Sequence, residues 1–381
     1  MKKILTLLIA LFAVTCDNPN QNVNGCIDET ACNYNVDANV DDDSCEFAEE
    51  NLNCDSGCIN DIDADGICDE EENTSWVFVA NEGNFGSSNG SISMIDEAGN
   101  VMHTENIGDV VQSLAVHENK LIVLINNSHL IKIYDITEDG LSMPGIEIST
   151  GNSSPRDLVV IDNKVYFTNW NTQDVKVLNL FNYSIENSIA INGLPEDLLF
   201  DGIDLWVTIP HSDQNFATGN TVSKIDINTN TILETIEVGN GPQELAMNNG
   251  ELFVSRTFYD ANWNTFHGAT KIGVDVINNN YGAGAACGGS IIKHNNSILR
   301  SFNGGLSLMD AELNLDTENK IGDYTQANVY HVEKINGSFW FAITNFTDIN
   351  EVRVVNEQGE EIANYTVGIN PGDFAFWEKI K

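Results

Sequence analysis

The chain has 381 residues, with 17 Lys and Arg against 57 Asp and Glu, for a formal net charge of -40 at pH 7. Such acidity argues against a nucleic-acid binder, because a phosphate backbone is held mainly by clustered cations. It also disfavours direct adsorption to anionic lipid. Hydrophobic residues make up 42% of the chain, which is enough for one large or two smaller domains with a real core.

The first residues are predicted to be a signal peptide, residues 1–15. Lys2 and Lys3 precede an apolar run, residues 4–14, that is too short to cross a bilayer comfortably. The run leads into Val14-Thr15-Cys16, which resembles a bacterial lipobox, although Thr15 departs from the usual small residue there. We expect a lipid on Cys16 followed by a polar tether, residues 16–24, as the chain's membrane attachment. Ordinary cleavage is the alternative.

A cysteine-rich module, residues 25–50, and a shorter acidic segment, residues 51–74, come next. In an exported chain, dense cysteines in so short a stretch predict disulfides, because the segment cannot bury enough surface to fold otherwise. A zinc site is the competing interpretation, but the region has no histidine. We predict three disulfides, with the pairing left open, among Cys26, Cys32, Cys45, Cys54, Cys58 and Cys68.

The acidic segment has the spacing of a calcium loop. Gly66 stands where the turn needs a glycine, and the flanking oxygens suit Ca²⁺, which takes six to eight hard ligands. The predicted ligands are Asp61, Asp63, Asp65, the Ile67 carbonyl, Asp69 and Glu72. This stretch resembles a thrombospondin type 3 calcium repeat, and the module before it resembles a cysteine module of secreted Bacteroidetes-type proteins. A solvated acidic linker is the alternative.

The rest of the chain repeats with a period of about 43 residues. One repeated feature is a strand that ends in an acid or amide, at residues 91–96, 131–135, 175–179, 222–226, 272–275, 306–310 and 352–356. The other is a turn followed by an inward apolar residue, at Leu114, Leu158, Leu198, Leu245, Ile291, Val332 and Phe374. Both features recur seven times with the same mean spacing.

This period, with about four short strands in each unit, predicts an all-β fold: a seven-bladed β-propeller over residues 75–381, preceded by a small disulfide-rich module. The final strand, residues 374–378, matches the one that opens a repeat, and residues 76–80 match the one after it. We therefore expect the C-terminus to complete the first blade and close the ring, which removes its open edges.

Three segments carry a family resemblance: residues 79–93, residues 108–113 and residues 153–156. They are similar to the YVTN-repeat (YncE-like) surface propellers of Bacteroidetes-type bacteria. The resemblance implies the propeller fold. Because some members capture cobalamin at the cell surface and pass it to an outer-membrane transporter, it also implies a possible corrinoid ligand. Blades five and six depart from the repeat pattern.

Loops after the second strand of each blade should gather on one face, where propellers commonly bind ligands. The aligned positions there are Asn81, Ile125, Asn169, Ile209, Arg256, Phe302 and Ile343. The next positions are Glu82, Asn126, Trp170, Pro210, Thr257, Asn303 and Thr344. This alignment brings together no set of histidines and carboxylates, so no catalytic metal is expected at the axis.

Two insertions, residues 210–216 and residues 256–267, lengthen neighbouring blades on that face. The second is rich in rings, which are costly to leave in water and suit a large planar or apolar ligand. Burial of the rings against their own blades is the alternative. The predicted ligand-binding residues are Asn81, Glu82, Asn126, Asn169, Trp170, His211, Arg256, Phe258, Tyr259, Trp263, His267 and Phe302.

These features predict a lipid-anchored binding protein at the outer membrane or cell surface, with no nucleic-acid partner. Our first hypothesis is capture of a ligand such as cobalamin for an outer-membrane transporter. The second is a protein-docking or adhesion propeller that binds a surface protein. The third is a lactonase-like hydrolase in which Glu82, Asn126 and Asn169 hold a divalent metal. Fold alone does not decide among them.

Overall fold

The computed structural model describes residues 22–49, 52–59, 74–284, 289–348 and 350–379. The chain divides into two compact units, one formed by Met1–Asn73 with Ile380–Lys381 and the other by Thr74–Lys379. The predicted signal peptide, Cys16, Cys68 and the predicted calcium ligands lie outside the described residues. Within the described part of the chain, no helix is long and apolar enough to span a bilayer.

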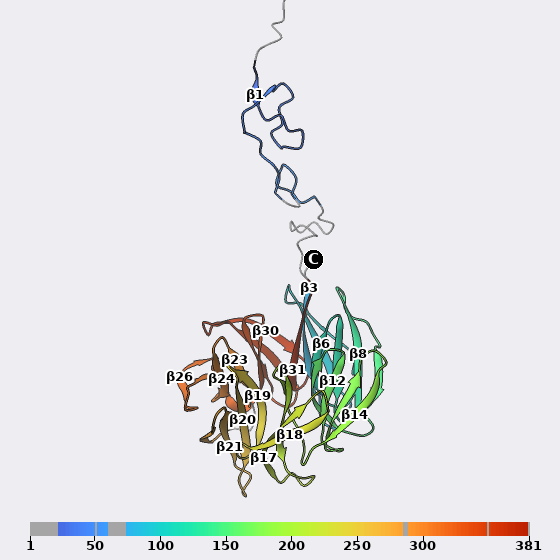
Figure 1. Ribbon diagram of the computed structural model, residues 1–381, viewed down its shortest axis with the longest axis vertical. Coiled ribbons are helices and arrows are strands. Elements are labelled where there is room, and N and C mark those ends of the chain that lie inside the picture. Colours follow the sequence, from blue (N-terminus) through green and yellow to red (C-terminus); the bar gives the residue numbers. More distant parts are fainter. Residues whose placement is uncertain (1–21, 50–51, 60–73, 285–288, 349, 380–381) are drawn as a thin grey trace, which may run out of the picture. The chain divides into compact units, whose positions relative to one another are not determined.

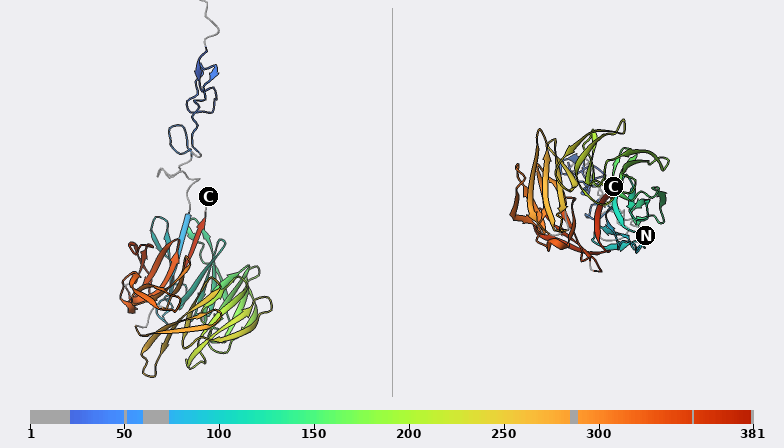
Figure 2. Two further views of the ribbon diagram at one scale, coloured as in Figure 1. Left: turned by 60° about the vertical axis from the view of Figure 1, so that its left-hand side comes forward. Right: turned by 90° about the horizontal axis from the view of Figure 1, so that it is seen from below.

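The second unit is a seven-bladed β-propeller, as the repeat predicted. Seven antiparallel sheets surround a common centre, which is clearest in the view from below (Figures 1 and 2). The first sheet is built from both ends of the unit, because β31 (Pro371–Lys379) pairs with β3 (Thr74–Asn81) along its whole length. This pairing closes the ring in the predicted way.

In chain order, the strands of each blade run from the innermost to the outermost. Blades 1 to 3 consist of β31, β3, β4 (Ser91–Asp96) and β5 (Val101–His103); β6 (Val111–His117), β7 (Lys120–Ile125), β8 (Leu130–Thr137) and β10 (Ile146–Ser149), with β9 (Gly140–Leu141) beside β8; and β11 (Pro155–Ile161), β12 (Lys164–Asn169), β13 (Asp174–Asn179) and β14 (Ser184–Ala190). Blades 4 and 5 consist of β15 (Leu198–Phe200), β16 (Asp204–His211), β17 (Thr218–Asp226) and β18 (Thr231–Glu237); and β19 (Pro242–Asn248), β20 (Glu251–Tyr259), β21 (Thr265–Ile272) and β22 (Val276–Ala283). Blades 6 and 7 consist of β23 (Ile291–His294), β24 (Ser297–Phe302), β25 (Gly305–Met309) and β26 (Leu315–Ile321); and β27 (Val329–Ile335), β28 (Ser338–Ile343), β29 (Asn350–Val355) and β30 (Glu361–Val367), with the short 3₁₀ helix η1 (Gln326–Asn328) before β27.

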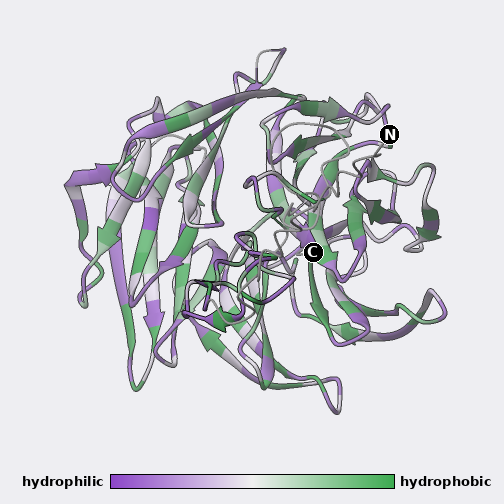
Figure 3. Cartoon of the chain, turned by 90° about the horizontal axis from the view of Figure 1, so that it is seen from above, coloured by the Kyte–Doolittle hydropathy of each residue, from purple (hydrophilic) through white to green (hydrophobic). Residues whose placement is uncertain are grey.

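The core lies between the blades. Seven clusters of buried apolar side chains occur among the described residues, one at each junction between neighbouring blades. In β7, Leu121 and Val123 pack toward blade 1 whereas Ile122 and Leu124 pack toward blade 3. Alternate side chains of a strand point to opposite faces, so a strand covered on both faces reads as a continuous apolar run. Figure 3 shows such hydrophobic stretches within the strands.

The strand register matches the predicted repeat in most blades. The third strands of blades 1 to 4 end close to the predicted acid or amide, as at Asp226 at the end of β17. Blade 5 differs, because β21 ends at Ile272 and the predicted strand at residues 272–275 is not formed. The two insertions lengthen strands: β20 and β21 form an extended hairpin that turns at residues 260–264.

A β-bulge marks the start of the innermost strand in five blades. A bulge places two residues of one strand opposite a single residue of its partner, which re-aims side chains. Consequently, consecutive residues such as Arg156 and Asp157 both reach the central cavity.

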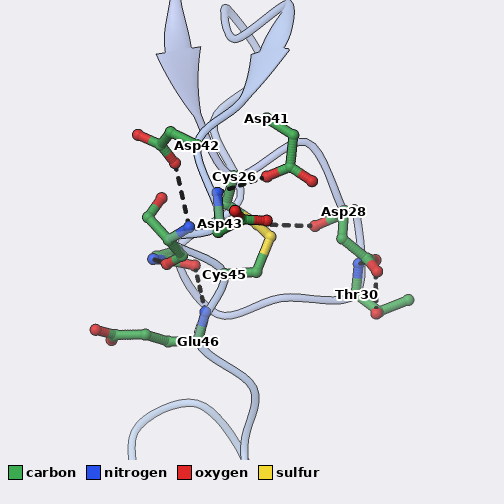
Figure 4. Close-up of a disulfide and its surroundings, with 10 residues drawn as sticks. Cys26, Asp28, Thr30, Asp41, Asp42, Asp43, Cys45 and Glu46 are labelled. Carbon is green, nitrogen blue, oxygen red and sulfur yellow. Dashed lines mark hydrogen bonds between the residues drawn. A yellow bond between two sulfur atoms is a disulfide. The ribbon is translucent and has the colours of Figure 1, made fainter.

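In the N-terminal unit, β1 (Asn24–Gly25) pairs in parallel with β2 (Val40–Asp41). The structure contains the disulfides Cys26–Cys45 and Cys32–Cys54, and Cys58 is also disulfide-bonded. Around the first disulfide, Asp28 accepts hydrogen bonds from the backbone and hydroxyl of Thr30 (Figure 4). Disulfides persist in oxidising compartments, so they indicate an extracellular or periplasmic location.

Candidate functional site

A cavity of about 820 Å³ runs along the propeller axis. Its lining comes mainly from the innermost strands and the residues directly before them, with a few residues from the ends of the second strands. We call the end of the cavity where the innermost strands begin the mouth. Cavities of this size fall within the range of small-molecule sites in proteins.

One repeat position supplies a polar side chain to the axis in every blade. We call this set the axial ring: Ser113, Asp157, Asp197, Glu244, Ser290, His331 and Asp373. Each member directly precedes the inward apolar residue of its repeat. The ring contains four carboxylates and a single histidine among its seven members, so its charge is predominantly negative.

Hydrogen bonds of the axial ring cross from one blade to the next. Asp197 accepts from the backbone N–H of Leu245 at 2.8 Å, and Asp157 accepts from the backbone N–H of Leu198 at 2.8 Å. The Asp373 carboxylate accepts from the backbone N–H of Leu114 at 2.6 Å. These bonds tie neighbouring innermost strands together and fix the carboxylates at the cavity wall.

Burial shifts the protonation of the ring. Burial raises the pKa of Asp157 to about 7, against the effect of hydrogen bonds donated by two backbone N–H groups. Burial also raises the pKa of Asp373 to about 7, with a further contribution from the nearby Glu333 carboxylate. For Asp197, burial and the charges of Asp157 and Glu244 raise the pKa well above its ordinary value. The ring therefore takes up protons more readily than exposed carboxylates do.

A second set of side chains forms a continuous hydrogen-bond chain at the mouth. Tyr330 donates to Glu82 at 2.8 Å, and Gln112 donates to the other oxygen of Glu82 at 3.3 Å. Arg156 links this pair to a third group, because it donates to the Gln112 carbonyl at 2.7 Å and to Glu196 at 2.6 Å. We call these five residues the mouth network. It spans blades 1, 2, 3, 4 and 7.

Aromatic rings cover one side of the mouth network. The Arg156 guanidinium lies 4.2 Å from the Trp170 ring centroid, a cation–π contact. Trp170 also contacts His211 and Phe216, each at 5.6 Å between ring centroids. The Trp170 indole nitrogen and the His211 Nδ1 are buried and have no hydrogen-bond partner among the described residues. Buried polar atoms of this kind are uncommon and are candidates for ligand contact.

The structure brings four of the twelve predicted ligand-binding residues to the cavity: Glu82, Trp170, His211 and Tyr259. The three predicted amides lie elsewhere, since they are buried and support strand ends. Asn126 donates to the Pro155 carbonyl at 2.8 Å, and Asn169 donates to the Phe167 carbonyl at 3.0 Å. Asn81 donates to Ser93 at 2.9 Å. Their amide N–H groups are thus used in local structure.

Arg256 does not line the cavity, in contrast to its expected place as the cation of the binding face. It is 3% exposed and donates to the Asn279 carbonyl and the Asn280 side chain within its own blade. His267 is also buried and packs on Phe302 with 6.0 Å between ring centroids. These three predicted residues form part of the junction between blades 5 and 6.

The extended β20–β21 hairpin has a different environment at its tip. Phe258 stacks on Phe266 with 5.8 Å between ring centroids. Trp263 is 78% exposed and contacts Tyr259, which is 42% exposed. Both interpretations of this insertion are therefore partly met: the base packs into the blade, while the tip leaves two aromatic rings in water.

Three groups of the kind that bind metals do converge at the axis, which the strand-end alignment did not indicate. His331, Glu333 and Asp373 each offer a ligand atom, and these atoms all lie within 4.8 Å of one another. The signal for the axial ring was present in the sequence, because the residue before the inward apolar residue is acidic in four of the seven repeats. We had interpreted that position only as part of a turn.

No protein-family model matches the chain, and no curated protein matches it. Matching solved structures include AztD from Citrobacter koseri, at 9% identity over 81% of this chain and 99% of that chain, with a TM-score of 0.49. The computationally designed Ika8 protein matches at 11% identity over 70% and 89% of the two chains, with a TM-score of 0.49. Hydrazine synthase of Kuenenia stuttgartiensis matches at 13% identity over 75% and 83%, with a TM-score of 0.44. Identities this low carry no information on ligand or activity.

Proposed function

We propose that this chain is an exported binding protein whose ligand contacts the mouth of the axial cavity. The observation that carries the proposal is the pair of buried, unpartnered ring nitrogens, Trp170 Nε1 and His211 Nδ1, beside the mouth network. Trp170 Nε1 can only donate a hydrogen bond, and Glu82 and Glu196 offer acceptors nearby in the cavity lining. A suitable ligand therefore presents both acceptors and donors next to a planar or apolar surface.

A corrinoid is the specific ligand that we propose to test first. Its amide side chains both donate and accept hydrogen bonds, and its macrocycle has an apolar face for the Trp170 and Phe216 rings. A ligand of this size would cover the mouth and insert only its side chains into the cavity. Delivery to an outer-membrane transporter, a lipid anchor on Cys16 and Ca²⁺ on residues 61–72 belong to the same proposal.

The test is a calorimetric titration of the full mature chain with cobalamin and with cobinamide. We expect Trp170→Ala to weaken binding at least tenfold, which corresponds to about 1.4 kcal/mol, because it removes the stacking surface and the indole donor. Trp263→Ala is the matched control, since its ring lies at the exposed hairpin tip. If Trp263→Ala weakens binding and Trp170→Ala does not, the mouth is not the site. If neither corrinoid binds, the corrinoid proposal is wrong.

A protein-docking function is the second candidate, and the hairpin tip favours it. Exposed tryptophan and tyrosine are enriched where proteins bind one another. Trp263 and Tyr259 supply such a pair on one extended hairpin. The hydrolase hypothesis gains less support, because the amides of Asn126 and Asn169 are bonded to backbone carbonyls at strand ends.

A further inference from the structure

The wall of the cavity between blades 7 and 1 combines imidazole and carboxylate groups. His331 and Glu333 are two residues apart on β27, so their side chains point to the same face of the strand. Asp373 lies near the start of β31, which packs beside β27. All three residues line the axial cavity.

The ligand atoms of these three residues lie within 4.8 Å of one another. Ligands placed about 2.1 Å from a tetrahedral zinc ion are roughly 3.4 Å apart, so small side-chain rotations would bring the three atoms to bonding distance. Glu333 can make such a rotation because its side chain is 40% exposed. One imidazole and two carboxylates form a donor set that suits zinc and similar divalent ions, with one position left open.

Neighbouring groups orient two of the three side chains. His331 Nδ1 lies 3.5 Å from a Glu244 oxygen, so Nε2 is the nitrogen turned toward Glu333, at 3.8 Å. A carboxylate beside the second ring nitrogen is the usual outer partner of a metal-binding histidine. Asp373 is fixed by the hydroxyl of Ser113 at 2.9 Å and by the Leu114 N–H.

Two further observations favour a cation at this place. The Glu333 Oε2 atom is buried and has no hydrogen-bond partner among the described residues, although it faces His331. Three carboxylates, Glu244, Glu333 and Asp373, surround one imidazole. Lys334, the nearest lysine in sequence, is directed to Glu357 at 2.9 Å. Burying several carboxylates around a single imidazole is unfavourable unless another cation offsets the charge.

We propose that His331, Glu333 and Asp373 form a binding site for one divalent transition-metal ion of the zinc class within the axial cavity. This site goes beyond the proposed ligand site at the mouth and uses none of its residues. Glu244 is a positioning residue that holds the imidazole. The open fourth position faces the cavity, where water or a group of a bound ligand completes the coordination.

The experiment titrates the full mature chain with Zn²⁺ in excess Ca²⁺, which occupies hard-oxygen sites elsewhere. Calorimetry gives the stoichiometry, and Co²⁺ in place of Zn²⁺ reports the ligand set through its visible absorption bands. His331→Gln should abolish one equivalent of binding, and Glu333→Gln should weaken it at least tenfold. Glu378→Gln, an exposed carboxylate on β31, is the matched control and should bind like the unaltered chain.

Metal held elsewhere in the chain is the same in all four proteins, so the comparison isolates this site. The proposal is overturned if His331→Gln and the unaltered chain bind the same number of ions with the same affinity. If His331→Gln does not fold, Glu333→Gln decides, because it keeps the imidazole and changes a partly exposed side chain. Trp170→Ala should leave zinc binding intact, so failure of the mouth site and failure of the metal site are distinguishable.

Discussion

The axial ring and the β20–β21 hairpin differ in where their side chains find partners. In the ring, Ser113 donates to Asp373, a residue 260 positions away, and to Asp157 in the next blade. At the hairpin tip, Tyr259 and Trp263 contact each other four residues apart. In a closed repeat protein, the polar groups that meet at the axis come from one repeat position in different blades. Local richness in aromatic residues is a poorer guide to a site than that shared position.

The base of the hairpin provides the strongest way to sharpen this comparison. Arg300 is fully buried and donates to the carbonyl oxygens of Gly268, Arg256 and Ser301. Arg300→Ala should lower the free energy of unfolding by about 3 kcal/mol, because it leaves a cavity and three carbonyls without a donor. Urea unfolding measures the change.

Arg353→Ala is the control for this prediction, since Arg353 forms partly exposed ion pairs with Glu351 and Glu361. Pairs of this kind contribute about 1 kcal/mol or less. Equal effects of the two substitutions would show that the junction between blades 5 and 6 does not depend on the buried guanidinium.

The axial ring should make stability depend on pH. Burial raises the pKa of Asp157 to about 7 and also raises that of Asp197. The folded chain then binds more protons than the unfolded chain between an ordinary carboxyl pKa of about 4 and the raised value. The free energy of unfolding therefore falls as the pH rises through about 7.

Asp197→Asn tests the origin of this slope. The amide oxygen can still accept from the Leu245 N–H, but the group no longer titrates. Urea unfolding between about pH 5 and pH 8 should show a shallower slope, by a fraction of the ~1.4 kcal/mol per pH unit that one full proton gives. Asp226→Asn, on an exposed turn where hydrogen bonds lower the pKa, should leave the slope unchanged. An unchanged slope in Asp197→Asn would assign the pH dependence to other groups.

The fold followed from the sequence because its determinants repeat and are local. Alternating apolar residues such as Leu121 and Ile122 specify both faces of a strand, and the matching strands at the two ends specify ring closure. The mouth was predicted in part, since Glu82 and Trp170 follow second strands as expected. The sequence could not indicate that Arg256 turns back into its own blade, because that orientation depends on the carbonyl of Asn279 on β22.

The metal-binding groups escaped prediction for a different reason. His331 lies in the most degenerate repeat, and Asp373 lies in the strand that closes the ring. Their approach depends on the bulges at the starts of β27 and β31 and on the closure itself. None of these features has a signature in the spacing of histidines and acids along the chain, whereas the acidic repeat position did.

The hairpin tip should give the smallest effect on stability. Trp263→Ala removes a ring that is 78% exposed and whose recorded ring contact is with Tyr259 on the same hairpin. The free energy of unfolding should change by no more than about 0.5 kcal/mol, as for other surface substitutions. Thermal and urea unfolding measure it, with Trp206→Ala, a buried residue between blades 4 and 5, as the contrasting variant. A loss of 2 kcal/mol or more, on the order expected for a buried ring, would contradict the exposed placement. A stable Trp263→Ala protein leaves this surface free for a partner and makes it the variant of choice for testing protein docking.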